Sequence, residues 1–182
     1  ASTDIQRNPL LLAWQTPHGL PPFADIEPGH FAPAFEFAMR AHREEIEAIA
    51  GQPEEPTFAN TVARLDACGR LFNRIESVFY NLCASETSPA LQAVQREMAE
   101  PLAAHSNAIY LHGALFARLD ALYEKRHELN MPPQDLRLLE RLHSDFVRAG
   151  ARLRGEQRAR YAATNEQLAS LMTRFGQNVL AD

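Results

Sequence analysis

Apolar side chains recur at steps of three and four residues along almost the whole chain from residue 30 to residue 179. Such steps place side chains on one face of an α-helix, whereas a strand needs alternation at every second residue, which no stretch shows. The pattern therefore predicts an all-α protein of about six long antiparallel helices. We expect them at residues 30–50, 58–85, 89–109, 114–129, 133–149 and 156–179. The start signal of the third helix is the clearest, because Ser88 is a favoured N-cap and Pro89 suits the first helical position.

Residues 1–29 follow a different pattern, because five prolines interrupt them. They still carry large apolar side chains, including Trp14 and Phe23, and a disordered tail would be more polar. We expect an extended Pro-rich arm over residues 1–29 that packs on a helical domain over residues 30–182. Nothing in the pattern marks a boundary inside that second part.

Composition narrows the function classes. The chain has 182 residues, 46% of them hydrophobic, so it can form a core without a disulfide or a metal. A net charge of −5 argues against a dedicated nucleic-acid binder. No apolar run approaches about 18 residues, so no membrane span is expected. No signal peptide is visible, which favours the cytoplasm; a signal removed before Ala1 would instead place the protein in the periplasm. The ending NVLAD directly after a strong helix is interpreted as a cut within a longer polypeptide.

The two cysteines, Cys68 and Cys83, are expected in one continuous helix, about 22 Å apart. That distance is too long for a disulfide, so they are interpreted as buried thiols in a reducing compartment.

Three arrangements of histidines and acids have some of the features of a metal site. His127 and Glu128 match the first two positions of H-E-x-x-H, but Met131 replaces the second histidine and two prolines end the helix. His105 and His112 are two helical turns apart, too far along the axis to share one zinc. Asp120, Glu124 and His127 form an i, i+4, i+7 line, which is more often a solvated stripe than a ligand set.

Clusters of charge are also interpreted as solvated faces. The alternatives are an acidic wall of a cleft, for the acidic clusters, and a binding site for an acidic ligand or a partner domain, for the basic cluster. The acidic clusters are Glu44, Glu45, Glu47, Glu54 and Glu55, and the basic cluster is Arg148, Arg152, Arg154, Arg158 and Arg160. No glycine-rich phosphate loop and no G-x-S-x-G elbow is present. The residues alone therefore predict a helical domain without a reaction, and no catalytic, cofactor-binding or metal-binding residue.

Several segments together resemble the N-terminal region of the thimet-oligopeptidase-like zinc peptidases, the M3 family, and most closely its bacterial peptidyl-dipeptidase branch. The strength lies in their order and spacing, because none is a short diagnostic motif. These segments are NPLLLAWQTPHGLPPFADIEPGHFAPAFEFAM, PTFANTVARLDACGRLFNRIESVFYNL, IYLHGALFARLDALYEKR, LRLLERLHSDFVRAGARL and NEQLASLMTRFGQNVLAD.

The resemblance implies the non-catalytic N-terminal domain of a longer enzyme that removes C-terminal dipeptides from short peptides. Family members hold catalytic zinc with H-E-x-x-H and a downstream glutamate, and none of these residues matches a position here. Zinc is therefore implied for the whole enzyme and not for this chain. The region would form a wall or lid beside the substrate channel, with short peptides and the C-terminal catalytic half of the same chain as partners, and no nucleic acid or membrane.

On this interpretation the isolated domain exposes an apolar patch where the catalytic half is missing. Two alternatives remain open: a free-standing helical module that binds peptides or a partner helix, and a complete small enzyme that binds its own metal through His105, His112 or His127.

Overall fold

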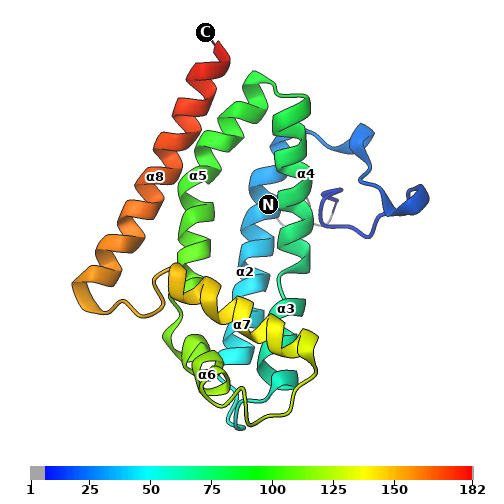
Figure 1. Cartoon of the computed structure of the whole chain (residues 1–182). Helices are drawn as coiled ribbons and strands as arrows, with labels where there is room; N and C mark the ends of the chain where they lie inside the picture. Colours follow the sequence, from blue (N-terminus) through cyan, green and yellow to red (C-terminus); the bar gives the residue numbers. More distant parts are fainter. Residues whose placement is uncertain (1–6, 182) are drawn as a thin grey trace. The chain divides into compact units, whose positions relative to one another are not determined.

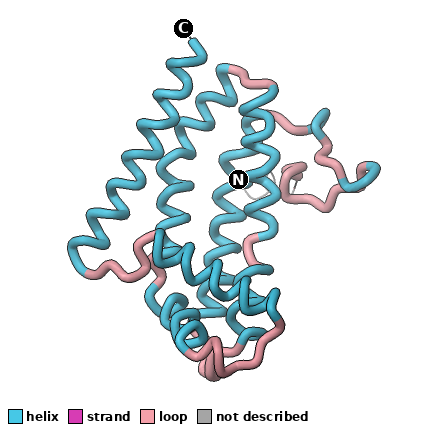
Figure 2. Tube along the Cα trace, viewed as in Figure 1, coloured by secondary structure: helices cyan, strands magenta, loops and turns pink. Residues whose placement is uncertain are grey.

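The computed structural model describes residues 7–181, which form helices joined by short connections, with no strand anywhere in that range (Figures 1 and 2). Six helices contain 12 to 27 residues, which confirms the all-α prediction. These are α2 (Phe31–Ala50), α4 (Arg70–Ser85), α5 (Pro89–Tyr110), α6 (Gly113–Glu124), α7 (Pro133–Arg148) and α8 (Gly155–Ala181). None of them is long and apolar enough to cross a membrane in the described part of the chain.

The residues group into two compact units, and three helices contribute residues to both. Unit 1 comprises residues up to His42, residues 69–101 and residues from Leu168 onward. Unit 2 comprises residues 43–68 and 102–167. The expected division into an arm at residues 1–29 and a domain at residues 30–182 stays a prediction.

The core of unit 1 is built on phenylalanine rings from α2 and α4. Phe35 meets Phe79 edge to face with ring centroids 5.2 Å apart, and Phe31 lies 4.9 Å from Phe79. Edge-to-face pairs of this kind add about 1 kcal/mol to the burial energy of the rings. Leu10 from the arm is fully buried in the same unit.

The arm is held by polar contacts to the rest of unit 1. The Asn8 side chain donates to the carbonyl of His30 at 2.8 Å and accepts from the amide of Leu10 at 3.0 Å. Arg74 on α4 donates to the carbonyls of Leu10 and Leu12, and its guanidinium lies 4.4 Å from the Trp14 ring centroid. Beyond these contacts the arm forms three short 3-10 turns, η1 (Pro17–Gly19), η2 (Phe23–Asp25) and η3 (Pro28–His30). Residues 1–6 of the expected arm lie outside the described residues.

Unit 2 has its own apolar core, formed by the last part of α2, the first turns after residue 58, and helices α6 and α7. Its fully buried members include Ile49, Val62, Leu115, Leu119 and Leu139. A buried histidine joins α6 to α7: His143, 5% exposed, lies 2.7 Å from an Asp120 carboxylate oxygen and stacks on the Tyr123 ring at 3.7 Å.

The expected continuous helix over residues 58–85 is wrong. The chain instead forms a π-helical segment, η4 (Phe58–Val62), a short helix, α3 (Ala63–Ala67), and then α4. Between α3 and α4, Cys68 is extended and Gly69 takes a left-handed φ of 68°. The estimate of 22 Å between the cysteines assumed one helix and therefore no longer holds, although no disulfide joins Cys68 and Cys83.

Replacing Gly69 with alanine should destabilise the fold by about 3 kcal/mol, because a β-carbon there combines left-handed strain with overpacking. The added atom would lie 2.5 Å from the His42 ring. Gly176, inside α8 with nothing within 4 Å of an added β-carbon, is the matched control. There the same change should stabilise by about 0.5–1 kcal/mol. Urea unfolding of both variants checks this, and equal effects at the two positions would contradict it.

The expected helix over residues 114–129 also ends early, at Glu124. After α6 the backbone forms turns over residues 125–130. In this segment the Glu128 amide donates to the Lys125 carbonyl, and Asn130 has a left-handed φ of 45°. The other boundaries lie close to their predicted positions, and α5 continues through Pro101.

Candidate docking face

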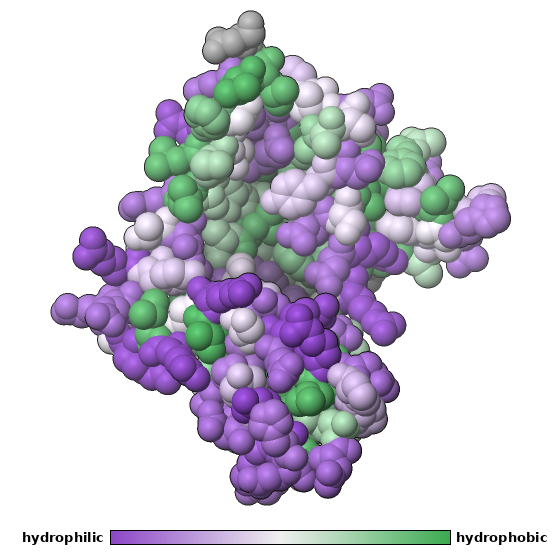
Figure 3. Space-filling model, in the orientation of Figure 1, coloured by the Kyte–Doolittle hydropathy of each residue, from purple (hydrophilic) through white to green (hydrophobic). Residues whose placement is uncertain are grey.

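Helix α8 has 27 residues and none of those described is buried. Its C-terminal part, from residue 168 onward, belongs to unit 1. It carries six large apolar side chains that are 52–69% exposed, namely Leu168, Leu171, Met172, Phe175, Val179 and Leu180. We call five of these the α8 stripe, namely Leu168, Leu171, Met172, Phe175 and Val179. Figure 3 shows hydrophobic surface gathered over this part of α8.

Three hydrogen bonds join α8 to α5 in unit 1. The Gln177 amide nitrogen donates to the Gln92 carbonyl at 2.9 Å and to the side-chain oxygen of Gln95 at 3.2 Å. The Gln177 oxygen accepts from the Arg96 guanidinium. The helix is therefore held to its neighbour by amide and guanidinium groups.

The orientation of α8 is the reverse of a normal surface helix. At about 100° per residue, Gln177 lies roughly 180° around the helix from Leu168, on the face opposite the stripe. An amphipathic helix in a globular protein normally turns its apolar side inward and its polar side to solvent. Here the polar side contacts α5, while the stripe is left uncovered.

The first part of α8, which belongs to unit 2, is attached in the same way. Asn107 on α5 donates to the carbonyl of Ala162 at 3.1 Å and to the Glu166 carboxylate at 3.2 Å. Asn165 donates back to the Asn107 side-chain oxygen at 3.0 Å. Both parts of α8 therefore form hydrogen bonds with α5.

The stripe is comparable in size to the largest apolar patch of a typical monomer. Five apolar side chains, each more than half exposed, form a patch on the order of 500 Å², and the largest patch of a monomer, about 300–600 Å², often has a function. The expectation that this chain exposes an apolar patch is confirmed. Exposed apolar patches of this size are typical of surfaces that another protein, a membrane or a ligand covers.

The histidines singled out from the sequence are not brought together as a metal site. The spacing of His105 and His112 assumed one helix, but α5 ends at Tyr110 and His112 caps the start of α6. The His112 ring accepts from the Leu115 amide at 3.1 Å and its other nitrogen lies 3.1 Å from Glu47. Within residues 7–181 no group of three or more histidine, cysteine or acidic side chains is placed to hold a metal.

The line of Asp120, Glu124 and His127 does not exist as a helical face, because α6 ends at Glu124. The Asp120 carboxylate instead lies 2.7 Å from the His143 ring nitrogen and 3.7 Å from the Arg152 guanidinium. His127 and Glu128 lie in the turn after α6, so the partial H-E-x-x-H match is not helical. A zinc ion of the peptidase type therefore has no matching donor set among the described residues.

The charged clusters are solvated for the most part. All five acids of the clusters, from Glu44 to Glu55, are exposed. Of the five arginines, only Arg158 is half-buried, and Arg154 donates to backbone carbonyls of Ala151 and Leu153.

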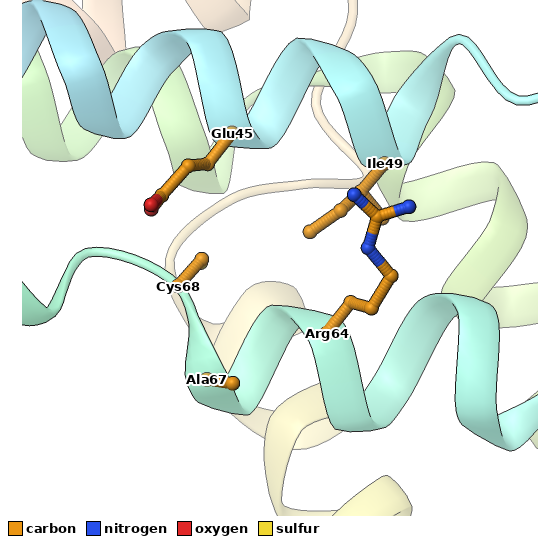
Figure 4. A pocket seen from close by; sticks show the side chains of 5 residues that line it. All are labelled: Glu45, Ile49, Arg64, Ala67 and Cys68. Atoms are coloured by element: carbon orange, nitrogen blue, oxygen red, sulfur yellow. The ribbon is translucent and has the colours of Figure 1, made fainter.

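A small pocket in unit 2 lies between α2 and α3 and has a volume of about 180 Å³. In Figure 4, Glu45 points from α2 toward the segment that holds Cys68, and Arg64 reaches from α3 toward Ile49. Burial, together with the nearby Glu45 carboxylate, raises the pKa of the Cys68 thiol to about 11. The thiolate is the reactive form of cysteine, so this pocket does not present an activated nucleophile.

Alkylation should therefore be slow at both cysteines, since burial also raises the pKa of the Cys83 thiol to about 11. At pH 8 each thiol should react with iodoacetamide about 100-fold more slowly in the folded chain than in urea, because the thiolate fraction falls tenfold per pH unit below the pKa. Because folding raises these pKa values, stability is fully present below about pH 9 and falls toward pH 11. Mass spectrometry of Cys68→Ser and Cys83→Ser variants separates the two rates. A rate that stops rising below pH 9 would contradict the assignment.

Comparison with known proteins identifies relatives whose names are those of peptidases. The chain is 42% identical over 177 residues to dipeptidyl carboxypeptidase of Salmonella typhimurium, covering 97% of this chain and 26% of the relative. It is 38% identical over 174 residues to dipeptidyl carboxypeptidase of Escherichia coli, covering 96% of this chain and 26% of the relative. Oligopeptidase A of Haemophilus influenzae is 28% identical over 173 residues, with 95% and 25% covered. No family model matches the chain. The chain spans about a quarter of the length of these relatives, and the match lies in their first quarter.

Proposed function

We propose that this chain is the non-catalytic N-terminal domain of a peptidyl-dipeptidase of the M3 family. The names of its relatives, dipeptidyl carboxypeptidase and oligopeptidase A, support this proposal. The whole enzyme would remove dipeptides from the C-termini of short peptides. The observation that carries the proposal is the 42% identity over 97% of the chain, confined to the first quarter of a dipeptidyl carboxypeptidase.

In this proposal the domain forms a wall or lid beside the substrate channel. Such a part limits access to short unfolded peptides and keeps water and folded proteins away from the reacting bond. The catalytic zinc would be held outside residues 1–182, by the histidines of H-E-x-x-H and a downstream glutamate. The partners are short peptides and the catalytic portion of the same polypeptide.

The exposed α8 stripe supports an assembly of this kind, since it leaves a large apolar surface to be covered. It supports equally the second candidate, a free-standing helical module that binds peptides or a partner helix. The proposed compartment is the cytoplasm, with the periplasm as the alternative, and fractionation of cells decides between them.

The first test is the mass of the native gene product, measured in its own cells by blot with an antibody to this domain. We expect a product about four times the mass of this chain, since the chain covers 26% of its relatives. The purified product should release dipeptides from short peptides, and removal of residues 1–182 should change which peptides it accepts. A product near 20.4 kDa that binds peptides without cleaving them would establish the free-standing module instead.

A further inference from the structure

The spacing of the α8 stripe defines what it fits. Leu168, Met172, Phe175 and Val179 follow one another at steps of four, three and four residues. This alternation is typical of the a/d positions, or seam, at which two helices pack side by side. We propose that the stripe seats an α-helix from the portion of the peptidase that corresponds to the remaining three quarters of its relatives. This inference rests on the proposed function and names the partner surface within it.

The absence of polar side chains in the stripe favours a helix over a loop or a strand. A helix satisfies its own backbone hydrogen bonds and can cover an apolar face without leaving amide groups unpaired. A loop or strand laid on the same face would bury amide and carbonyl groups that the stripe cannot bind. Gly176 lies beside the seam with nothing within 4 Å of an added β-carbon, so a second helix has room to approach.

The length of the relatives favours a segment of the same polypeptide over a second copy of this chain as the occupant. The chain covers only 26% of the length of the two dipeptidyl carboxypeptidases, so about three quarters of a peptidase of that length lies outside residues 1–182. A segment of the same polypeptide is present at a high effective concentration, whereas a second copy must associate from solution.

A lipid surface is disfavoured by the other face of α8. Helices that lie in a membrane interface carry lysine and arginine on a solvated polar face. Here the opposite face carries Gln177, which is bonded to Gln92 and Gln95 of α5. A patch on the order of 500 Å² is also smaller than the area of about 800 Å² that each partner buries in a standard protein interface. The smaller area suits a single helix better than a whole domain.

Photo-crosslinking in the whole peptidase tests the inference. Phe175 is replaced by p-benzoylphenylalanine, which keeps an aromatic ring in the seam, and Arg174 is replaced in the same way as the matched control on the same turn. After irradiation, digestion and mass spectrometry, position 175 should cross-link at least about five-fold more than position 174, since neighbouring side chains on a helix point about 100° apart. The linked peptide should come from the same polypeptide beyond residue 182 and carry apolar residues at steps of three and four.

Every other result overturns the inference. Those results are a cross-link between two copies, a cross-link to a segment without that spacing, or equal yields at the two positions. Dipeptide release, measured on the same preparation, keeps the two proposals apart. An active peptidase with the wrong cross-link refutes only the helix seat. The expected cross-link in a protein that releases no dipeptides refutes only the proposed activity.

Discussion

Replacing Arg118 with methionine is expected to lower the free energy of unfolding by about 3–4 kcal/mol, since four hydrogen bonds of a buried cation are lost. Arg118 lies on α6 and is 8% exposed. Its guanidinium donates to the carbonyls of Gln52 and Glu54 at 3.0 and 2.9 Å, and to the side chains of Thr61 and Asn60 at 3.3 and 3.1 Å. It therefore fixes the loop between α2 and η4.

The loss is large because the acceptors stay behind. Methionine fills much of the same volume, but it leaves the carbonyl oxygens of Gln52 and Glu54 without their donor, and also the hydroxyl oxygen of Thr61, which is fully buried. Arg118→Lys should cost less, about 1–2 kcal/mol, because a single ammonium cannot reproduce the planar fork.

Arg141→Met is the matched control for this measurement. Arg141 is exposed on α7, and its single ion pair within the described part of the chain joins it to the exposed Asp66 at 3.6 Å. Such surface pairs contribute at most about 1 kcal/mol to the free energy of unfolding. Urea titration followed by circular dichroism measures both variants. A loss below about 1 kcal/mol for Arg118→Met would show that the loop is held by other contacts.

Helix boundaries that are marked by capping residues could be predicted from the sequence. Ser88 accepts a hydrogen bond from the Leu91 amide at 3.2 Å, as expected of an N-cap next to Pro89. Such signals act over one turn and need no knowledge of the tertiary fold. The sequence pattern did not predict the break in the helix at Gly69, because the apolar steps of three and four residues continue across it. A glycine within such a pattern is usually tolerated in a helix.

Contacts between distant residues were beyond the sequence pattern. Arg118 looked like any surface arginine, because arginines are mostly exposed and its acceptors lie 57 to 66 residues away. Asp120 was assigned to a line with Glu124 and His127, whereas its partner His143 comes from α7. Periodicity identified the apolar series of α8 but said nothing about which face meets α5, because both faces fit a helix equally well.

Introducing two carboxylates into the α8 stripe should have a small effect on the isolated chain and a large effect on the proposed whole peptidase. In the isolated chain, Leu171→Asp with Phe175→Asp should change the free energy of unfolding by no more than about 1 kcal/mol, the cost of two aspartates inside a helix. Both side chains are already exposed there, at 57% and 64%. The variant should also associate with itself less than the unchanged chain, as measured by light scattering.

In the whole peptidase the same two changes should be severe, because docking would bury two unpaired charges. Each such charge costs several kcal/mol, so we expect dipeptide release to fall by about 100-fold or more. Asn73→Asp with Gln134→Asp is the control, since it adds the same charge at exposed positions on α4 and α7, outside the stripe. That control should keep its activity within about two-fold, in line with the small effect of surface substitutions. If both double variants retain full activity, the stripe is not covered in the working enzyme, and the domain acts through another surface.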